Sequence, residues 1–384
     1  MRIFQVMEAW ATSGFLQGQT WLRNLNEPLL ELGHEAILFP ADDGRRAMQQ
    51  RNSAARAVFS QKLLDTFRVV HAKKPFDMFF AYLMDGMIET GVIDEIRRVG
   101  VPTCNFSCNN THQFNLVAEL SPHFDYNLHS EKDTAEKFRA IGANPIWFPM
   151  AANPKYYHPY DVPRTLDVTF VGQCYARRPY YIWHLLENSV NVQVFGPGWL
   201  LKPDKPLLRR PVRWARRTKL LLQAMIAFSP RNRHRFSAQV ADIDLRDGLR
   251  QKYSAHLHVP LTDDEMIRKF SESKISLGFL EVYDAHNPEE LIKQHLHLRE
   301  FEAPMSGALY LTGWCEELAE FYEIDKEVVV YRSEHELLDK VQFYSKHPNQ
   351  ADRVRRAGHQ RALADHTYQK RFKYLFAQLG IKAN

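Results

Sequence analysis

LDVTFVGQCYARRPYYIWHLLENSVNVQVFGPGW, residues 166–199, contains the elements that decide the fold. Residues 166–171 form an apolar run that predicts a buried strand ending at a glycine, residues 177–189 predict a helix, and residues 190–199 begin with a second strand. A strand, a helix and another strand in this order predict a parallel βαβ unit. The same alternation extends in both directions, so the sequence predicts a doubly wound α/β protein.

The rest of the chain repeats this alternation twice. In the first half, strands are expected at 1–7, 34–41, 76–83, 101–108, 124–131 and 145–151, with helices at 20–33 and 46–72 among those between them. In the second half, further strands are expected at 255–262, 275–282, 308–313 and 327–333, followed by amphipathic helices to the end of the chain. Two Rossmann-like halves with a proline-containing joint at 151–163 are therefore predicted.

The predicted domains follow from this division. Residues 1–155 form an amino-terminal domain, residues 156–350 form a carboxyl-terminal domain with a basic insertion at 200–254, and residues 351–384 form terminal helices. Two such domains face a central cleft with the carboxyl ends of their strands, where open α/β sheets bind ligands. The loops that follow strands are therefore the place to look for chemistry.

The basic insertion stands out in the charge pattern. The 384-residue chain carries a net charge of +5, while residues 200–250 alone hold thirteen Lys or Arg and four Asp, a net charge of +9. Two interpretations stay open for residues 207–236, which mix Arg and Lys with Trp, Leu and Met: an amphipathic helix at an anionic membrane surface, or a solvated insertion. Nucleic-acid binding is the least favoured interpretation, because no nucleic-acid motif accompanies the charge.

Several classes of protein are excluded by composition. Four cysteines without a Cys-x-x-Cys pair give neither a disulfide framework nor zinc spacing. The amino terminus reads as a strand and not as a signal peptide, and the longest apolar run, near 220–228, is far shorter than the roughly 20 residues of a membrane span. The sequence therefore predicts a cytoplasmic protein that at most touches a membrane surface.

A glycine followed by an arginine-rich helix start is the first chemical motif. Gly172 allows close approach of a ligand, and the helix amino terminus with Arg177 and Arg178 suits a phosphate. Gly196 lies in a Gly-Pro-Gly turn after the next strand. The sequence contains neither G-x-G-x-x-G nor a P-loop, and a solvated first helical turn is an equal alternative for the arginines.

HLHLREFEAPMSGALYLTGWCEEL, residues 295–318, is the second motif. Charged residues run directly into a helix and a buried strand. Glu302, near the helix start, could simply complement the helix dipole. It could instead accept the hydroxyls of a ribose, while Arg299 holds a diphosphate, and this interpretation is preferred because it also accounts for the arginine.

The first half offers polar loops after its strands. Such loops suit a hydroxylated acceptor, with Glu8, Asp85 and His112 as possible bases. Most Asn and His residues in loops are simply turn formers, which is the alternative for each of them. The residues in question are Glu8, Trp10, Ser13, Gly14, Asp85, Asn105, Asn109, Asn110 and His112.

The second half resembles the group 1 nucleotide-sugar glycosyltransferases, and more closely their spore-maturation-protein-B-like branch. The matching segments are DVTFVGQCYARRPYY, VQVFGPGW, PLTDDEMIRKFSESKISLGF, LREFEAPMSGALYLT, EELAEFYEIDKEVVVYRSEHELLDKVQFY and HTYQKRF, which together span most of residues 166–373. The resemblance implies the two-domain GT-B fold, with the terminal helix packing back toward the first domain. It also implies a nucleoside diphosphate sugar held by the second domain, with no metal and no other cofactor.

The resemblance assigns roles to individual residues. It implies that Glu302 is the ribose ligand, as the second Glu of an E-x7-E pattern, and Gln294 occupies the position of the first Glu. It also implies that Arg178 contacts the diphosphate, while Gln173 occupies a position where many relatives have Arg. The predicted catalytic residues are Arg178, Arg299 and Glu302 from the second half, together with His112 from the polar loops of the first half. The predicted donor-binding residues are Gly172, Gln173, Arg177, Gly196, Pro260, Lys293, Gln294, Ser306 and Gly307. The predicted acceptor-binding residues, from the polar loops of the first half, are Glu8, Ser13, Gly14 and Asn109.

The implied reaction is glycosyl transfer to a hydroxyl of a glycan, lipid-linked or protein acceptor, with retention of configuration. Stabilisation of the leaving diphosphate lowers the barrier in this scheme. Three alternatives stay open: a nucleotide-sugar-binding protein that has lost catalysis, which Gln294 favours, a nucleotide-sugar epimerase of the same fold, and a membrane-surface scaffold.

Overall fold

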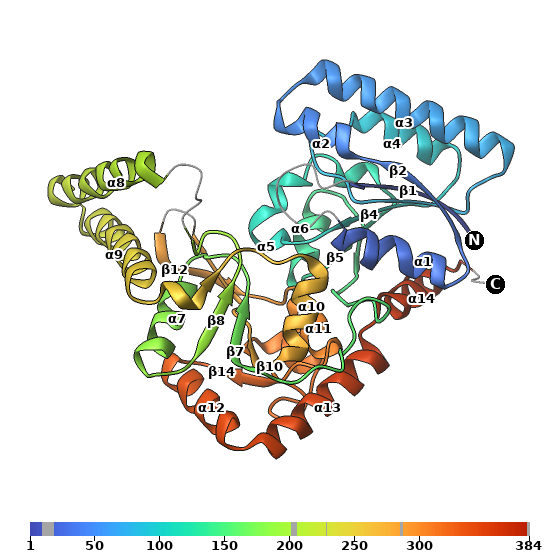
Figure 1. Cartoon of the computed structure of the whole chain (residues 1–384). Helices are drawn as coiled ribbons and strands as arrows, with labels where there is room; N and C mark the ends of the chain where they lie inside the picture. Colours follow the sequence, from blue (N-terminus) through green and yellow to red (C-terminus); the bar gives the residue numbers. More distant parts are fainter. Residues whose placement is uncertain (10–18, 201–205, 228, 285–286, 382–384) are drawn as a thin grey trace. The chain divides into compact units, whose positions relative to one another are not determined.

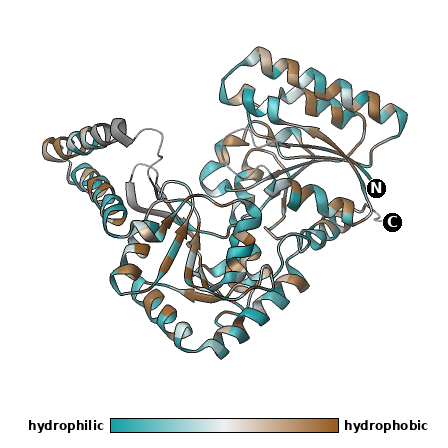
Figure 2. Cartoon of the chain, viewed as in Figure 1, coloured by the Kyte–Doolittle hydropathy of each residue, from teal (hydrophilic) through white to brown (hydrophobic). Residues whose placement is uncertain are grey.

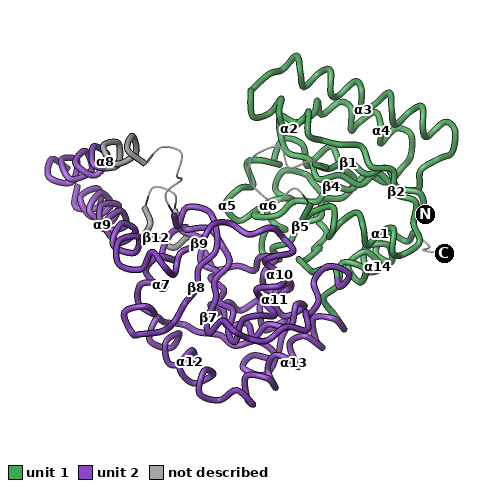
Figure 3. Tube along the Cα trace, viewed as in Figure 1, with its two compact units in different colours: residues 1–153, 365–384 green, residues 154–364 purple. Residues whose placement is uncertain are grey.

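The computed structural model describes residues 1–9, 19–200, 206–227, 229–284 and 287–381 (Figure 1). Its contacts divide the chain into two compact units (Figure 3). Unit 1 comprises residues 1–153 and 365–384, and unit 2 comprises residues 154–364. Helix α13 (Pro348–Asp365) belongs almost entirely to unit 2 and α14 (Tyr368–Gln378) to unit 1, whereas the sequence grouped both in one terminal segment.

Unit 1 is built on a six-stranded sheet in the order β2-β1-β3-β4-β5-β6, with every neighbouring pair parallel. Its strands are β1 (Arg2–Met7), β2 (Glu35–Pro40), β3 (Met78–Ala81), β4 (Thr103–Ser107), β5 (Tyr126–His129) and β6 (Pro145–Trp147). Its α-helices are α1 (Glu27–Glu31), α2 (Asp42–Gln49), α3 (Ser53–Lys73), α4 (Thr90–Arg98), α5 (Asn110–Gln113), α6 (Ala135–Ala140) and α14.

Aromatic packing holds unit 1 together. The ring of Phe4 on β1 lies 5.4 Å from that of Phe67 on α3, in an edge-to-face arrangement. Phe372 on α14 lies 5.6 Å from Phe80 and 5.4 Å from Phe148, all three fully buried. Because aromatic side chains bury the largest apolar areas, these contacts fix α14 onto the unit.

Unit 2 is built on a second six-stranded parallel sheet, in the order β14-β13-β10-β7-β8-β9. Its strands are β7 (Leu166–Val171), β8 (Val192–Phe195), β9 (Leu257–His258), β10 (Ser273–Leu277), β13 (Tyr310–Gly313) and β14 (Val329–Tyr331). Its helices are α7 (Arg178–Glu187), α8 (Pro206–Ile226), α9 (Pro230–Lys252), α10 (Asp263–Glu272), α11 (Arg299–Met305), α12 (Glu334–Lys346) and α13.

Strands of both sheets are largely hydrophobic, and the helices present hydrophilic residues outward (Figure 2). The two parallel six-stranded sheets with covering helices confirm the predicted doubly wound α/β class. This pattern is expected of parallel sheets, whose two faces are both covered by helices.

Three expected elements differ in detail. The expected helix 20–33 is a π-helical turn (Leu22–Asn26) followed by α1, with Pro28 in its first turn, where the missing N–H costs nothing. The expected helix 46–72 is two helices, because Arg51 adopts a left-handed conformation (φ 51°) and Asn52 caps α3 by accepting from the Ala55 amide at 3.0 Å.

The expected strand 275–282 also divides. β10 ends at Leu277, and the chain continues into an antiparallel hairpin of β11 (Glu281–Asp284) and β12 (Asn287–Gln294). A side chain at Gly278 would lie 2.2 Å from the hydroxyl of Tyr310, so the glycine lets the chain pass this residue closely.

Candidate functional site

Three glycines mark the carboxyl-terminal edge of the unit 2 sheet. Gly172 follows β7, Gly196 follows β8 and Gly278 follows β10, and these strands are neighbours in the order β10-β7-β8. We call this edge the glycine edge. Helix α7 begins here because it follows β7, and α11 begins here because it leads back to the start of the parallel strand β13. Open parallel sheets bind ligands at this edge.

The loops at Gly172 and Gly196 interlock through their backbones. The amide of Gly172 donates to the Phe195 carbonyl at 2.9 Å, and the Trp199 indole donates to the Gly172 carbonyl at 2.8 Å. Gly196 has φ 150°, and a side chain there would lie 2.1 Å from the Gly172 carbonyl oxygen. Glycine is therefore required at 196 for the two loops to meet.

Arg178 lies in the first turn of α7 and contacts the loops that follow β7 and β10. Its guanidinium donates to the Gln173 carbonyl at 3.3 Å and to the Phe279 carbonyl at 3.4 Å, both long contacts. The Nε atom has no hydrogen-bond partner in the described part of the chain, and burial lowers the pKa of this arginine. An arginine stays charged in proteins, so a half-buried cation with spare donor capacity lies at the helix amino terminus.

The Arg299–Glu302 ion pair lies on the first turn of α11. Arg299 donates to one carboxylate oxygen of Glu302, whose side chain is 1% exposed, against 31% for Arg299. The other oxygen, Oε1, and the Arg299 Nε have no partner among the described residues. Burial and the nearby Glu302 charge raise the pKa of Tyr157 well above its usual value. The pair can take further hydrogen bonds, but a ligand reaches Glu302 only if neighbouring side chains move.

Glu300 has a different environment one residue from Arg299. Its carboxylate accepts from the Tyr310 hydroxyl and from the His297 amide, both at 2.7 Å. Burial raises the pKa of Glu300 to about 7. Glu300 therefore ties the start of α11 to β13, which explains one of the charged residues at the edge of the buried strand.

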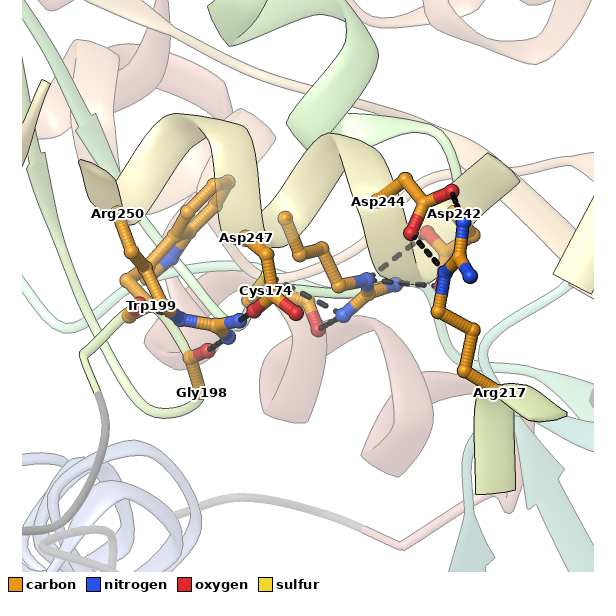
Figure 4. Close-up of polar contacts among 9 residues, drawn as sticks. Cys174, Gly198, Trp199, Arg217, Asp242, Asp244, Asp247 and Arg250 are labelled. Atoms are coloured by element: carbon orange, nitrogen blue, oxygen red, sulfur yellow. Dashed lines mark hydrogen bonds and ion pairs between the residues drawn. The ribbon is translucent and has the colours of Figure 1, made fainter. Parts of the chain in front are cut away.

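The basic insertion folds into α8 and α9, and α9 holds the glycine-edge loops (Figure 4). Arg246 donates to the Cys174 carbonyl at 3.0 Å and contacts its Sγ at 3.2 Å. Arg250 donates to the carbonyls of Gly198 and Trp199, both at 2.8 Å. We call these two arginines the α9 clamp, because each guanidinium satisfies loop carbonyls that follow a strand of the sheet.

Aspartates on α9 pair with arginines of the insertion (Figure 4). Asp242 pairs with Arg246 at 2.8 Å and Asp247 with Arg250 at 3.1 Å. Asp244 pairs at 2.6 Å with an arginine of α8. Part of the positive charge of this segment is therefore engaged within the fold.

A family model described as glycosyl transferase-like matches residues 182–377, just over half of the chain. The chain belongs to the glycosyl transferase-like family. The matched region includes the second half of α7, the α9 clamp, the Arg299–Glu302 pair, α13 and nearly all of α14. No curated protein sequence matches it.

Solved structures of glycosyltransferases share the fold of this glycosyl transferase-like protein. Sucrose-phosphate synthase from Thermosynechococcus elongatus superposes with a TM-score of 0.57 at 11% identity, covering 99% of both chains. AviGT4, a glycosyltransferase involved in avilamycin A biosynthesis, gives 0.56 at 13% identity, covering 98% of this chain and 96% of its own. HepE from Anabaena, in complex with UDP and glucose, gives 0.56 at 10% identity, covering 99% of both. At these identities the likeness shows the GT-B fold, as predicted.

Several residues predicted to bind the donor lie at or near the glycine edge. Gln173 is exposed directly after Gly172, and Pro260 is exposed after the edge strand β9. Arg177 lies over the ring of Tyr180, 4.8 Å from its centroid. Lys293 and Gln294, both partly buried, end β12.

Ser306 and Gly307 lie elsewhere. They follow α11 at the opposite edge of the sheet, where Gly307 accepts from Arg164 at 3.3 Å and the Ser306 carbonyl accepts from Ser271. The Ser306 hydroxyl donates to the Glu302 carbonyl at 2.8 Å. The structure therefore uses both residues to close the helix and does not bring them to the glycine-edge loops.

The predicted acceptor residues belong to unit 1. Glu8 follows β1 and pairs with Arg45 at 3.2 Å, and burial raises the pKa of Glu8. Asn109 follows β4 in a left-handed conformation (φ 61°), and burial lowers the pKa of His112 on α5. Ser13 and Gly14, together with Trp10, lie outside the described residues.

Three other polar residues of unit 1 have structural partners. Asp85 accepts from the backbone amides of Glu119 and Leu120 at 3.0 and 2.9 Å, so its carboxylate fixes a loop. Asn105 bonds the amide and carbonyl of Leu83, and Asn110 donates to Ser107. These contacts favour the turn-forming interpretation over a role as acceptor ligands.

Sequence reasoning missed the α9 clamp and Tyr157. A signal for the clamp existed, because Asp242, Arg246 and Arg250 recur at four-residue spacing on one helical face. No comparable pattern pointed to Tyr157, whose position beside Glu302 depends on tertiary packing.

Proposed function

We propose that the protein transfers a glycosyl group from a nucleoside diphosphate sugar to a hydroxyl of a glycan or lipid-linked acceptor, without a metal and with retention of configuration. Unit 2 holds the donor at the glycine edge in this proposal, and unit 1 supplies the acceptor side. Membership of the glycosyl transferase-like family supports the reaction class. The resemblance to the spore-maturation-protein-B-like branch is part of the proposal.

The observation that carries the proposal is the arrangement around Gly172. Two interlocked glycine loops, the amino terminus of α7 and the half-buried Arg178 converge at one strand end. Backbone amides, a helix dipole and a guanidinium with an unused nitrogen form a suitable environment for a diphosphate. HepE was solved with UDP and with UDP-glucose on the same fold, which supports a uridine nucleotide as first probe.

The proposed mechanism stabilises the leaving group. The bond between the anomeric carbon and the diphosphate oxygen breaks, and the acceptor oxygen forms the new bond to that carbon. Negative charge grows on the diphosphate, and in this proposal Arg178 and the α7 amino terminus stabilise it. The acceptor proton passes to a base, for which His112 is the candidate, since its lowered pKa keeps the imidazole neutral and able to accept a proton.

The nucleoside contacts are the least defined part of the proposal. Glu302 is proposed as the ribose ligand, with its carboxylate accepting from a ribose hydroxyl in place of the neighbouring Tyr157. Because the carboxylate is buried, binding requires rearrangement around Tyr157. Gln294 stands where a carboxylate is implied, so contact with the sugar must come from other groups.

A thermal-shift screen with nucleoside diphosphates tests the proposal. A ligand that binds only the folded protein at one hundred times its Kd stabilises it by about 2.7 kcal/mol. We expect one nucleoside diphosphate to raise the Tm, and Arg178→Ala to abolish the shift. Absence of a shift with every nucleoside diphosphate would remove the donor assignment.

Gln294 keeps a second candidate function open, a protein that binds nucleotide sugars without transferring them. Incubation with the binding nucleotide sugar separates the cases. Transferase activity gives glycosylated acceptor, an epimerase gives a changed sugar from donor alone, and a binding protein returns the donor intact.

A further inference from the structure

Helix α8 presents one face to the rest of unit 2. It packs against α9, which in turn packs against α7 and β12 (Figure 1). Leu220 and Ala224, four residues apart, are 7% and 8% exposed. Residues at this spacing share one helical face, so this face turns toward the fold.

The opposite face of α8 is apolar and exposed. Trp214 is 70% exposed, Met225 77% and Ile226 71%, with Leu221 and Leu222 also exposed. Trp214, Leu221 and Met225 follow one another at helical spacings of seven and four residues, and Leu222 and Ile226 lie beside them. We call these five residues the α8 apolar face. Large side chains gathered in this way mark an interaction surface.

Most of the charge near the α8 apolar face is positive, and the acidic contact of α8 is the pair between Arg217 and Asp244 of α9. Residues 206–241 contain nine Lys or Arg and neither Asp nor Glu. Arg216 and Lys219 on α8, and Arg231 and Arg233 at the start of α9, are exposed. Exposed apolar side chains beside these exposed cations complement an anionic lipid surface, where acyl chains contact the apolar side chains and headgroups contact the cations.

We propose that the α8 apolar face docks the protein on an anionic lipid bilayer. No described helix is long and apolar enough to cross a membrane, so the contact is a surface one. The docking deepens the proposed function, because it would bring unit 2 to lipid-linked acceptors. It does not depend on donor chemistry, since the exposed face and its charge exist whatever the glycine edge binds.

Vesicle flotation tests the docking. The full chain is mixed with vesicles of phosphatidylcholine alone or with added phosphatidylglycerol. We expect binding to the phosphatidylglycerol vesicles that weakens with salt. Met225→Ser with Ile226→Ser should lower the partition coefficient about tenfold per side chain. The matched control, Val58→Ser with Val69→Ser, changes two exposed apolar residues on α3 and should bind like wild type.

A second pair of substitutions tests the charges. Arg216→Ser with Lys219→Ser should lower binding to anionic vesicles about fivefold per charge removed. UDP affinity and Tm are measured on every variant, so that a loss of folding or of the donor site is distinguished from a loss of docking.

Two results would overturn the proposal. In the first, wild type binds both vesicle types equally, or the α8 variants float like wild type. In the second, sedimentation shows a dimer that the α8 substitutions dissociate and vesicles do not bind, which assigns the face to a second copy of the chain.

Discussion

Replacing Arg299 by alanine should destabilise unit 2 by about 3 kcal/mol. The substitution leaves Glu302, whose side chain is 1% exposed, as a buried carboxylate without its cation. Removing one partner of a buried ion pair costs about 3–5 kcal/mol. We take the lower end of this range because the Arg299 side chain keeps 31% exposure, and water screens part of its interaction.

The companion substitutions isolate the pair itself. Glu302→Gln removes the charge but keeps the shape of the side chain, so we expect the free energy of unfolding to fall by about 1 kcal/mol. The double variant Arg299→Met with Glu302→Leu replaces the pair by apolar groups of similar volume and should recover most of the stability lost by Arg299→Ala. Urea unfolding followed by circular dichroism measures the free energies. A cost below about 1 kcal/mol for Arg299→Ala, or no recovery in the double variant, would refute this account of the buried pair.

Three further predictions use matched variants. Arg250→Ala removes two 2.8 Å hydrogen bonds from the α9 clamp, so it should lower the free energy of unfolding by about 2 kcal/mol and weaken UDP binding. The control Arg217→Ala breaks an exposed ion pair and should cost under about 1 kcal/mol. Urea unfolding measures the stabilities, and calorimetric titration measures UDP binding. Gly196→Ala places a side chain 2.1 Å from a backbone oxygen, so it should lower the free energy of unfolding by about 3 kcal/mol. Gly91→Ala, where nothing lies within 4 Å of the added side chain, should be nearly neutral, and equal unfolding midpoints for the two variants would contradict this. The pKa of Glu300 is about 7 in the folded protein, above its ordinary value, so the folded state binds this proton more tightly than the unfolded state. The free energy of unfolding should therefore fall by about 3 kcal/mol as the pH rises from about 4.5 to about 7. Glu300→Gln should flatten this part of the pH profile measured by urea unfolding.

Strand and glycine positions were accessible from the sequence because they depend on local patterns. The apolar runs that end at Gly172 and Gly196 predicted β7 and β8. The glycines marked the ends of these runs, but the requirement for glycine at 196 comes from the close approach of the Gly172 loop, 24 residues away. The division of 46–72 was also encoded locally, in the capping residue Asn52, but was overlooked.

Other features depend on contacts between distant segments. Arg246 and Cys174 lie 72 residues apart, so no short-range pattern shows that a basic insertion holds the loop after β7. The burial of Glu302 depends on packing around α11 and on Tyr157, and the position of Ser306 at the far edge follows from the length of that helix. The hairpin of β11 and β12 was missed because β11 begins inside the expected strand 275–282, and β12, with the sequence NPEELIKQ, lacks the apolar pattern of a strand.

A crystal structure with UDP-glucose tests the central claim most directly. The account predicts diphosphate density at the Gly172 and Gly196 loops, within hydrogen-bonding distance of Arg178 and of amides at the start of α7. Density for the nucleotide away from the glycine edge, or a glycine edge still filled by protein side chains at saturating ligand, would contradict it.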